Sequence, residues 1–167
     1  AIDALGHRAQ ALLDELALVT DDPGRVTRTY LSPAHARSID LVGAWMRERG
    51  MTTSIDAVAT LRGRRAADVA PEAAKTLLIG SHIDTVIDAG KLDGGLGVVA
   101  GLLAVEEIER RGRRLRFAAE ILAFGDEEGV RFPTALSSSS AVTGTYRRDW
   151  LAARDGDGRS LGEALAD

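Results

Sequence analysis

The sequence has 167 residues, of which 45% are hydrophobic, 28% charged and 4% aromatic, and its formal net charge is −4. These values are typical of one soluble globular unit with a largely aliphatic core. The acidic balance argues against a nucleic-acid partner, and the lack of a long apolar run argues against a membrane-spanning segment. Because cysteine is absent, any metal site must use imidazole and carboxylate ligands. We expect a cytoplasmic protein.

The first part of the chain predicts two helices. Apolar side chains recur at helical spacing over residues 3–18. Ser32 followed by proline is typical of an N-cap and a first helical position, so a second helix is expected from there. That helix should continue to Arg49 and end at Gly50.

Strand patterns follow, with a helix between the last two. Residues 51–61 are strand-like, and the polar residues 64–75 predict a loop. The short apolar run at 76–80 is typical of a strand buried on both faces, and 117–124 has the pattern of another buried strand. Residues 96–109 predict a helix with small side chains that allow close packing on a sheet. Strand, helix and strand in this order predict an α/β sheet with its site at the carboxyl edge. Two further helical segments are expected, within 137–150 and at 161–166.

A histidine and an aspartate stand at the end of the first buried strand. His82 and Asp84 are two residues apart, and such residues point the same way in a strand. A histidine that binds a metal needs an acceptor for its other ring nitrogen. His82 and Asp84 therefore supply a possible ligand and its orienting group, although a His-x-Asp pair alone can also be incidental.

Further carboxylates follow within the same region. Asp93 lies in a glycine-rich turn before a helix, where it could reach back over the strand end or simply cap the helix. Glu127 and Glu128 come directly after Asp126 and a buried strand, where adjacent carboxylates are costly unless cations hold them. In metallohydrolases, one such carboxylate binds metal while its neighbour takes a proton from water. Together these residues predict a site for two divalent metals.

Two other motifs have structural explanations. The arginine-rich run at 110–116 is expected to be a solvated helix end with Gly112 after the last turn, rather than an anion site. Residues 155–158 resemble half of a calcium loop, but Ala166 stands where a bidentate glutamate is required. A surface turn is therefore expected there.

The segments GSHIDTVIDAGKLDG at 80–94 and FGDEEGVRF at 124–132 resemble the dinuclear metallohydrolases of the aminoacylase and carboxypeptidase superfamily. The resemblance is closest to the branch that acts on ureido compounds, the allantoate amidohydrolases and N-carbamoyl-L-amino-acid hydrolases. Within both segments the amino-acid sequence is more similar to that of the allantoate enzymes. Weaker similarity covers most of the chain.

The resemblance implies a mixed sheet flanked by helices, as part of a zinc-peptidase-like catalytic domain, and a role for each matching residue. His82 would bind the first metal, with Asp84 orienting it. Asp93 would bridge both metals, and Glu128 would bind the second. Glu127 would be the general base that activates water. The metals would be manganese or zinc, and the reaction with allantoate would release ammonia and carbon dioxide.

The chain also departs from the family pattern. Family members are more than twice as long, supply one further histidine ligand to each metal, and carry a lid and dimerisation domain. Residues 1–167 are therefore expected to be the N-terminal portion of a catalytic domain that lacks the lid. The resemblance implies a homodimer and a small-molecule ureido substrate for the full-length enzyme. Thr60 and Ser138 stand where relatives usually have Asn and Gly.

Alternatives to this interpretation stay open at this point. The same metal edge could belong to an N-carbamoyl-L-amino-acid hydrolase, a peptidase or an N-acyl amino-acid hydrolase. The chain could also be an inactive remnant that folds and binds at most one metal weakly. For the isolated chain we expect little or no activity.

Overall fold

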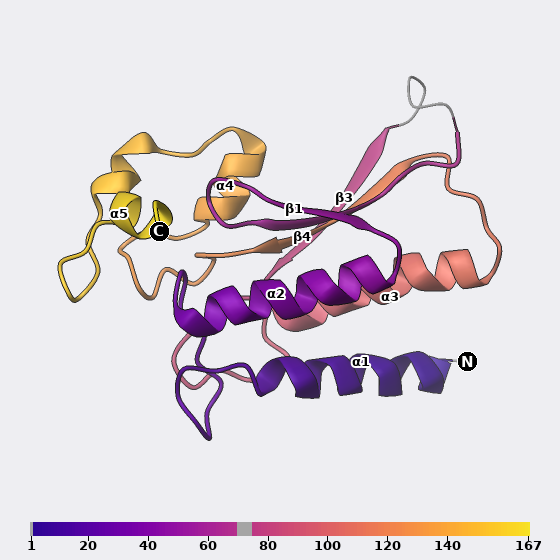
Figure 1. The fold of residues 1–167 in the computed structure, drawn as a ribbon, viewed down its shortest axis with the longest axis horizontal. Helices are drawn as coiled ribbons and strands as arrows, with labels where there is room; N and C mark the ends of the chain where they lie inside the picture. Colours follow the sequence, from indigo (N-terminus) through magenta and orange to yellow (C-terminus); the bar gives the residue numbers. More distant parts are fainter. Residues whose placement is uncertain (1, 70–74) are drawn as a thin grey trace.

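The computed structural model describes residues 2–69 and 75–167, and it is built around a four-stranded sheet with helices packed on it (Figure 1). The helices are α1 (Ile2–Ala17), α2 (Pro33–Glu48), α3 (Gly95–Arg110), α4 (Ser137–Thr143), the 3₁₀ helix η2 (Arg148–Ala152) and α5 (Leu161–Leu165). The strands are β1 (Thr52–Ile55), β2 (Leu61–Arg65), β3 (Thr76–His82) and β4 (Ala118–Phe124). Their order is β1-β2-β4-β3, with β3 parallel to β4 and the other pairs antiparallel. The predicted α/β fold with a mixed sheet and flanking helices is confirmed.

Three long helices form the layers on one side of the sheet. In Figure 1, α2 and α3 lie side by side next to the sheet, and α1 lies beyond them and packs against α3. The Ser32 hydroxyl accepts the N–H of His35 and caps α2, as the sequence predicts. Gly50 follows that helix with a φ of 72°, which a residue without a Cβ adopts readily. The aliphatic core lies between these helices and the sheet.

The segment predicted as one strand at 51–61 is instead a hairpin. Asp56 turns the chain because its carboxylate accepts the backbone N–H groups of Val58 and Thr60. The returning strand β2 extends through Arg65, so the predicted loop at 64–75 is wrong at its start. Residues 70–74 of that loop lie outside the described residues.

Strand β3 is more exposed than its sequence predicts. Leu77 and Leu78 are 47% and 45% exposed, although the run is apolar on both faces. The expectation of a strand buried on both faces is wrong here, because β3 is the last strand in the sheet order and pairs only with β4 in the described part of the chain. By contrast, β4 is buried along nearly its whole length.

Both structural explanations for the remaining motifs are confirmed. Helix α3 ends at Arg110, and Gly112 follows it with a φ of 64°. The Asp155 carboxylate accepts the N–H groups of Asp157 and Arg159, which closes a surface turn. A capping box between Ser160 and Glu163 then begins α5. No helix in the described residues is long and apolar enough to cross a membrane.

Candidate metal centre

His82 ends strand β3 and directs its ring toward the carboxyl edge of the sheet. Its Nδ1 lies 2.9 Å from the main-chain carbonyl oxygen of Asp84, so this carbonyl fixes the tautomer and leaves Nε2 free for a ligand. The Asp84 carboxylate, whose Oδ1 lies 3.6 Å from Nδ1, raises the pKa of His82 to about 9. Burial opposes this shift, and the Asp84 carbonyl and the Glu128 carboxylate reinforce it.

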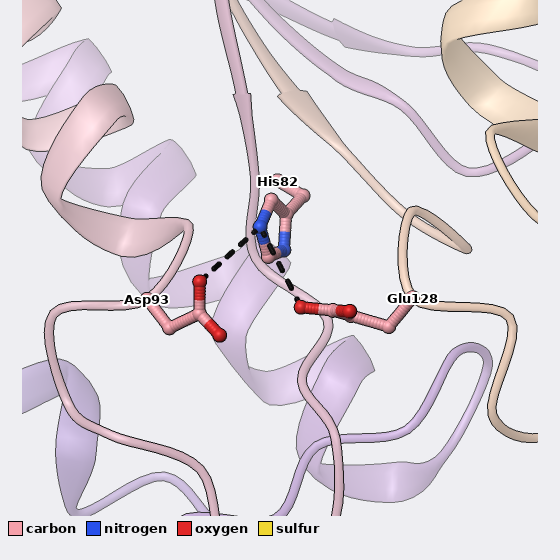
Figure 2. A group of neighbouring side chains, drawn as sticks. All are labelled: His82, Asp93 and Glu128. Atoms are coloured by element: carbon pink, nitrogen blue, oxygen red, sulfur yellow. Dashed lines mark ion pairs between the residues drawn. The ribbon is translucent and has the colours of Figure 1, made fainter.

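Two carboxylates converge on the free ring nitrogen. Figure 2 shows Asp93, from the turn before α3, and Glu128, from the loop after β4, on either side of His82. Asp93 Oδ1 lies 3.7 Å from Nε2, and Glu128 Oε1 lies 3.9 Å from it. The ligand atoms of the three residues all lie within 4.8 Å of one another. The sequence-predicted ligands are therefore brought together.

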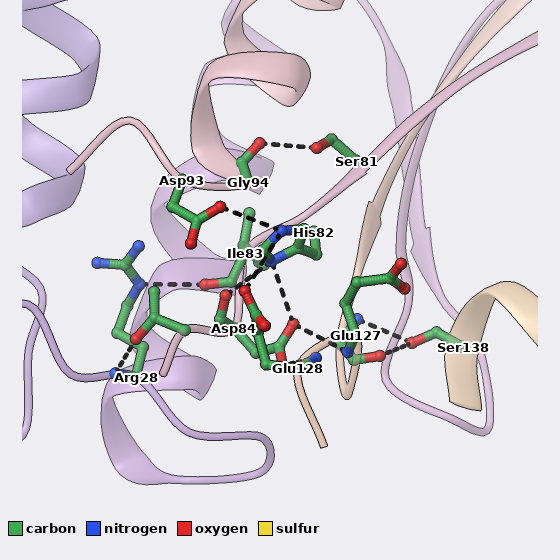
Figure 3. Close-up of polar contacts among 12 residues, drawn as sticks. Arg28, Ser81, His82, Ile83, Asp84, Asp93, Gly94, Glu127, Glu128 and Ser138 are labelled. Carbon is green, nitrogen blue, oxygen red and sulfur yellow. Dashed lines mark hydrogen bonds and ion pairs between the residues drawn. The ribbon is translucent and has the colours of Figure 1, made fainter. Parts of the chain in front are cut away.

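Asp84 lies behind this group rather than in it. Its side chain is only 2% exposed, and its two carboxylate oxygens accept the backbone N–H groups of Glu127 and Glu128, each at 3.3 Å. The contact that orients His82 at hydrogen-bond distance thus comes from the Asp84 carbonyl, and the carboxylate holds the start of the acidic loop (Figure 3).

Glu127 lies beside the three-residue group, and its carboxylate is not among the converging ligand atoms. Its Oε2 accepts a long hydrogen bond of 3.4 Å from the Ser139 hydroxyl in α4. The Glu127 side chain therefore contacts α4 through Ser139 and supplies no atom to the group of His82, Asp93 and Glu128.

A known family covers the part of the chain that forms this edge. A model of peptidase family M28 matches residues 58–152, which include every residue of the group. The chain belongs to peptidase family M28.

Relatives of this M28 chain include proteins named for ureido chemistry. Allantoate deiminase 1 of Glycine max is 45% identical over 84% of the chain, and N-carbamoyl-L-amino acid amidohydrolase of Geobacillus stearothermophilus is 39% identical over 96%. A crystal structure of a hydantoinase/carbamoylase family amidase from Burkholderia ambifaria superposes with a TM-score of 0.88, at 39% identity, over 96% of the chain. The chain covers 29% and 39% of the two curated relatives and 39% of the amidase.

The donor set of the M28 chain fits a divalent metal. Two ligands about 2.1 Å from a tetrahedral ion are separated by about 3.4 Å, so the observed separations of 3.7 and 3.9 Å require inward shifts of only tenths of an ångström. One nitrogen and two carboxylate oxygens suit zinc or manganese. Within the described residues this is the one group of this kind, so a second ion would need donors beyond it.

Electrostatics of the M28 site favour a cation. Burial raises the pKa of Glu128, and the neighbouring Asp93 and Asp84 carboxylates raise it further, whereas His82 lowers it. These carboxylates repel one another at the same edge, and a bound cation would relieve that repulsion.

Gly94 belongs to the glycine-rich turn that the sequence predicts would let Asp93 reach back over the strand end. It is the N-cap of α3, with a φ of 64°, and no side chain of the described residues caps the helix, so the capping alternative for Asp93 is not what the structure shows. A Cβ at Gly94 would lie 2.5 Å from both Nδ1 and the carbonyl oxygen of His82. The Ser81 hydroxyl donates to the Gly94 carbonyl at 2.8 Å. Glycine here lets the Asp93 turn approach the histidine.

Hydroxyl groups from the serine-rich segment hold the end of β4, and the sequence analysis did not predict this role. Asp126 is fully buried, and its Oδ2 accepts hydrogen bonds from Thr134 at 2.6 Å and from Ser137. The Ser138 hydroxyl donates to the carbonyl of Gly125 at 2.6 Å and accepts its N–H at 2.8 Å. The run of four serines is the feature of the sequence from which this role could have been predicted. The hydrogen bonds of Ser137 and Ser138 hold the loop that presents Glu127 and Glu128.

Proposed function

We propose that this chain is the N-terminal portion, residues 1–167, of the catalytic domain of a metal-dependent hydrolase that cleaves a C–N bond in a ureido compound. The observation that carries the proposal is the convergence of His82, Asp93 and Glu128 at the carboxyl edge of the sheet. The chain spans about a third of the length of the curated relatives it matches, which supports a longer protein. The gene product should then have at least twice the mass of 17.7 kDa.

Each residue of the edge has a role in this proposal. His82, Asp93 and Glu128 hold metal, and Asp84 positions them through its carbonyl and carboxylate contacts. A bound divalent ion polarises the ureido carbonyl and lowers the pKa of water. Glu127 accepts the proton from the attacking water and returns it to the departing nitrogen.

In the complete site, Asp93 would help to hold each of two divalent ions, manganese or zinc. Its half-exposed position, 49% for the side chain, leaves an oxygen accessible to a second ion. The further ligands come from the remainder of the protein, since the group gathered here supplies one imidazole and two carboxylates.

Allantoate is the substrate we favour, with release of ammonia and carbon dioxide. The allantoate deiminase of Glycine max is 45% identical to the chain, and the carbamoylase of Geobacillus stearothermophilus is 39% identical. The margin is small, so an N-carbamoyl-L-amino acid is the second candidate. We further propose a cytoplasmic homodimer for the full-length protein.

A substrate panel tests the proposal. The complete gene product, loaded with manganese or zinc, is assayed for ammonia release from allantoate and from N-carbamoyl-L-amino acids, and for cleavage of dipeptides and N-acyl amino acids. Allantoate should give the largest kcat/KM. Turnover of dipeptides or N-acyl amino acids alone would replace the ureido proposal by a peptidase or an aminoacylase. Absence of turnover on every substrate would favour an inactive remnant.

A further inference from the structure

Arg28 is a buried cation in the segment between α1 and α2. It is 1% exposed, and in the described part of the chain no ion pair joins it to a carboxylate. A charge in such a position is costly unless its hydrogen bonds are satisfied in a fixed geometry. Its contacts therefore indicate what the residue is for.

The guanidinium binds main-chain carbonyls from two places in the fold. Its Nε donates to the carbonyl of Ile83 at 3.1 Å, immediately after the end of β3 (Figure 3). Its Nη1 donates to the carbonyls of Leu16 and Val19, at 3.1 and 3.2 Å, where α1 ends. The side chain thus ties the C-terminal end of α1 to the end of β3.

The main chain of Arg28 makes a second connection two residues further on. Its N–H donates to the Thr85 hydroxyl at 2.8 Å, and its carbonyl accepts the N–H of Thr85 at 2.9 Å. Ile83 and Thr85 are the two neighbours of Asp84 in the chain. One residue therefore fixes the peptide on both sides of Asp84.

Asp84 in turn contacts the proposed ligand His82 and the loop that carries the proposed ligand Glu128. Its carbonyl is the acceptor at 2.9 Å from His82 Nδ1, and its carboxylate accepts the N–H groups of Glu127 and Glu128. A shift of the peptide at Asp84 would therefore move the histidine ring and the acidic loop together.

We propose that Arg28 is a positioning residue of the metal centre, which sets the separation of His82 and Glu128 by holding both peptide neighbours of Asp84. The inference rests on the proposed metal site. A buried arginine suits this role because its planar fork binds several carbonyls in a fixed arrangement, which a lysine ammonium cannot reproduce.

The test measures metal affinity apart from turnover. Zinc is titrated calorimetrically into the chain and into its Arg28→Met, Arg28→Lys and Thr85→Val variants, and each melting temperature is measured without metal. Groups that orient metal ligands typically affect affinity 10–100-fold. We expect Arg28→Met to weaken zinc binding by at least about tenfold. Arg28→Lys should recover little, because it restores the charge without the fork.

A matched control separates positioning from stability. Arg49 is also largely buried, at 17% for its side chain, and it pairs with Glu106 at 2.6 Å between α2 and α3, away from residues 83–85. Arg49→Met should lower the melting temperature and leave zinc affinity within about twofold of the parent chain, because it touches none of the site contacts.

The zinc affinities of these variants can overturn the positioning role of Arg28 or the metal site itself. Zinc binding in Arg28→Met equal to that of the parent, or reduced no more than in Arg49→Met, overturns the positioning role. If Arg28→Met does not fold, Thr85→Val decides, because it removes one of the Arg28 contacts beside Asp84 and conserves side-chain shape. If the parent chain binds no zinc, or binds it equally well as His82→Ala, the proposed metal site fails, and the positioning role fails with it.

Discussion

At the scale of single residues, the proposed function gives Glu127 the role of proton acceptor and His82 that of a metal ligand. Glu127 lies outside the converging ligand atoms, whereas His82 is at their centre. Changing Glu127 to Gln in the complete protein should keep metal binding and reduce kcat by about 10²–10⁴-fold, because an amide cannot accept the proton. His82→Ala should instead lose metal. Calorimetric titration and ammonia release measured on both variants distinguish the roles, and near-normal turnover of Glu127→Gln would exclude Glu127 as the base.

His35 makes a second residue-scale prediction, about acid stability. It is buried against Tyr30, with ring centroids 5.5 Å apart, and its Nε2 is buried without a hydrogen-bond partner among the described residues. Burial lowers the pKa of His35 from 6.5 to about 4, and Asp84 only partly opposes this. Since the unfolded chain then binds the proton first, this contribution to stability is complete above about pH 6.5 and is lost as the pH falls toward about 4.

Urea unfolding at several pH values measures this contribution. Between pH 7 and 4, the parent chain should lose up to about 3 kcal/mol more of its free energy of unfolding than His35→Gln, which cannot take up the proton. Above pH 7, the free energies of unfolding of the parent chain and of His35→Gln should change with pH in nearly the same way. Parallel stability profiles down to pH 4 would show that His35 does not titrate this way.

At the scale of elements, the start of α3 depends on a glycine that lets a turn approach a strand end. Gly94→Ala places a methyl group where the His82 ring and carbonyl now lie, in a backbone conformation with positive φ that L-residues rarely adopt. Because Asp93 precedes this position, we expect zinc affinity to fall at least about tenfold. Gly90→Ala is the matched control, since a Cβ there meets nothing within 4 Å. Equal zinc affinities in the two variants would contradict this steric requirement.

The elements also show how far the sequence alone predicts this molecule. Helix bounds follow from caps and periodicity, which are local, so α2 with its Ser32 cap and Gly50 end is predicted nearly to the residue. The hairpin at Asp56 is missed because a side chain that turns the chain looks like an ordinary polar residue within a β-branched stretch.

The site also contains residues that a sequence pattern predicts and a residue that no pattern predicts. His82, Asp93 and Glu128 are predictable because the carboxyl ends of parallel strands meet at one edge, and β3 and β4 are such a pair. Arg28 is not predictable, because its partners are main-chain carbonyls distant in sequence that leave no pattern in the residues.

At the scale of the whole molecule, the exposed edge of the sheet predicts how the isolated chain behaves. Strand β3 carries the exposed Leu77 and Leu78, and apolar edge strands are templates for pairing with another chain. The isolated chain should therefore self-associate with rising concentration in sedimentation experiments, and Leu78→Lys should reduce this. Ile55→Lys, on the opposite edge strand β1, is the control, because Ile55 is 57% exposed on a strand of only four residues. Equal effects of both changes would argue against pairing through β3.

The number of metal ions bound is a second property of the whole molecule. In the described residues, one imidazole and two carboxylates converge, which is enough for one ion that keeps water in its remaining positions but not for two. The isolated chain should therefore retain about one zinc per chain after dialysis and release no measurable ammonia from allantoate, whereas the complete protein should retain about two. Elemental analysis with a protein assay gives both ratios. Two ions per isolated chain, both lost in His82→Ala, would show that these residues form the dinuclear centre without help from the remainder of the protein.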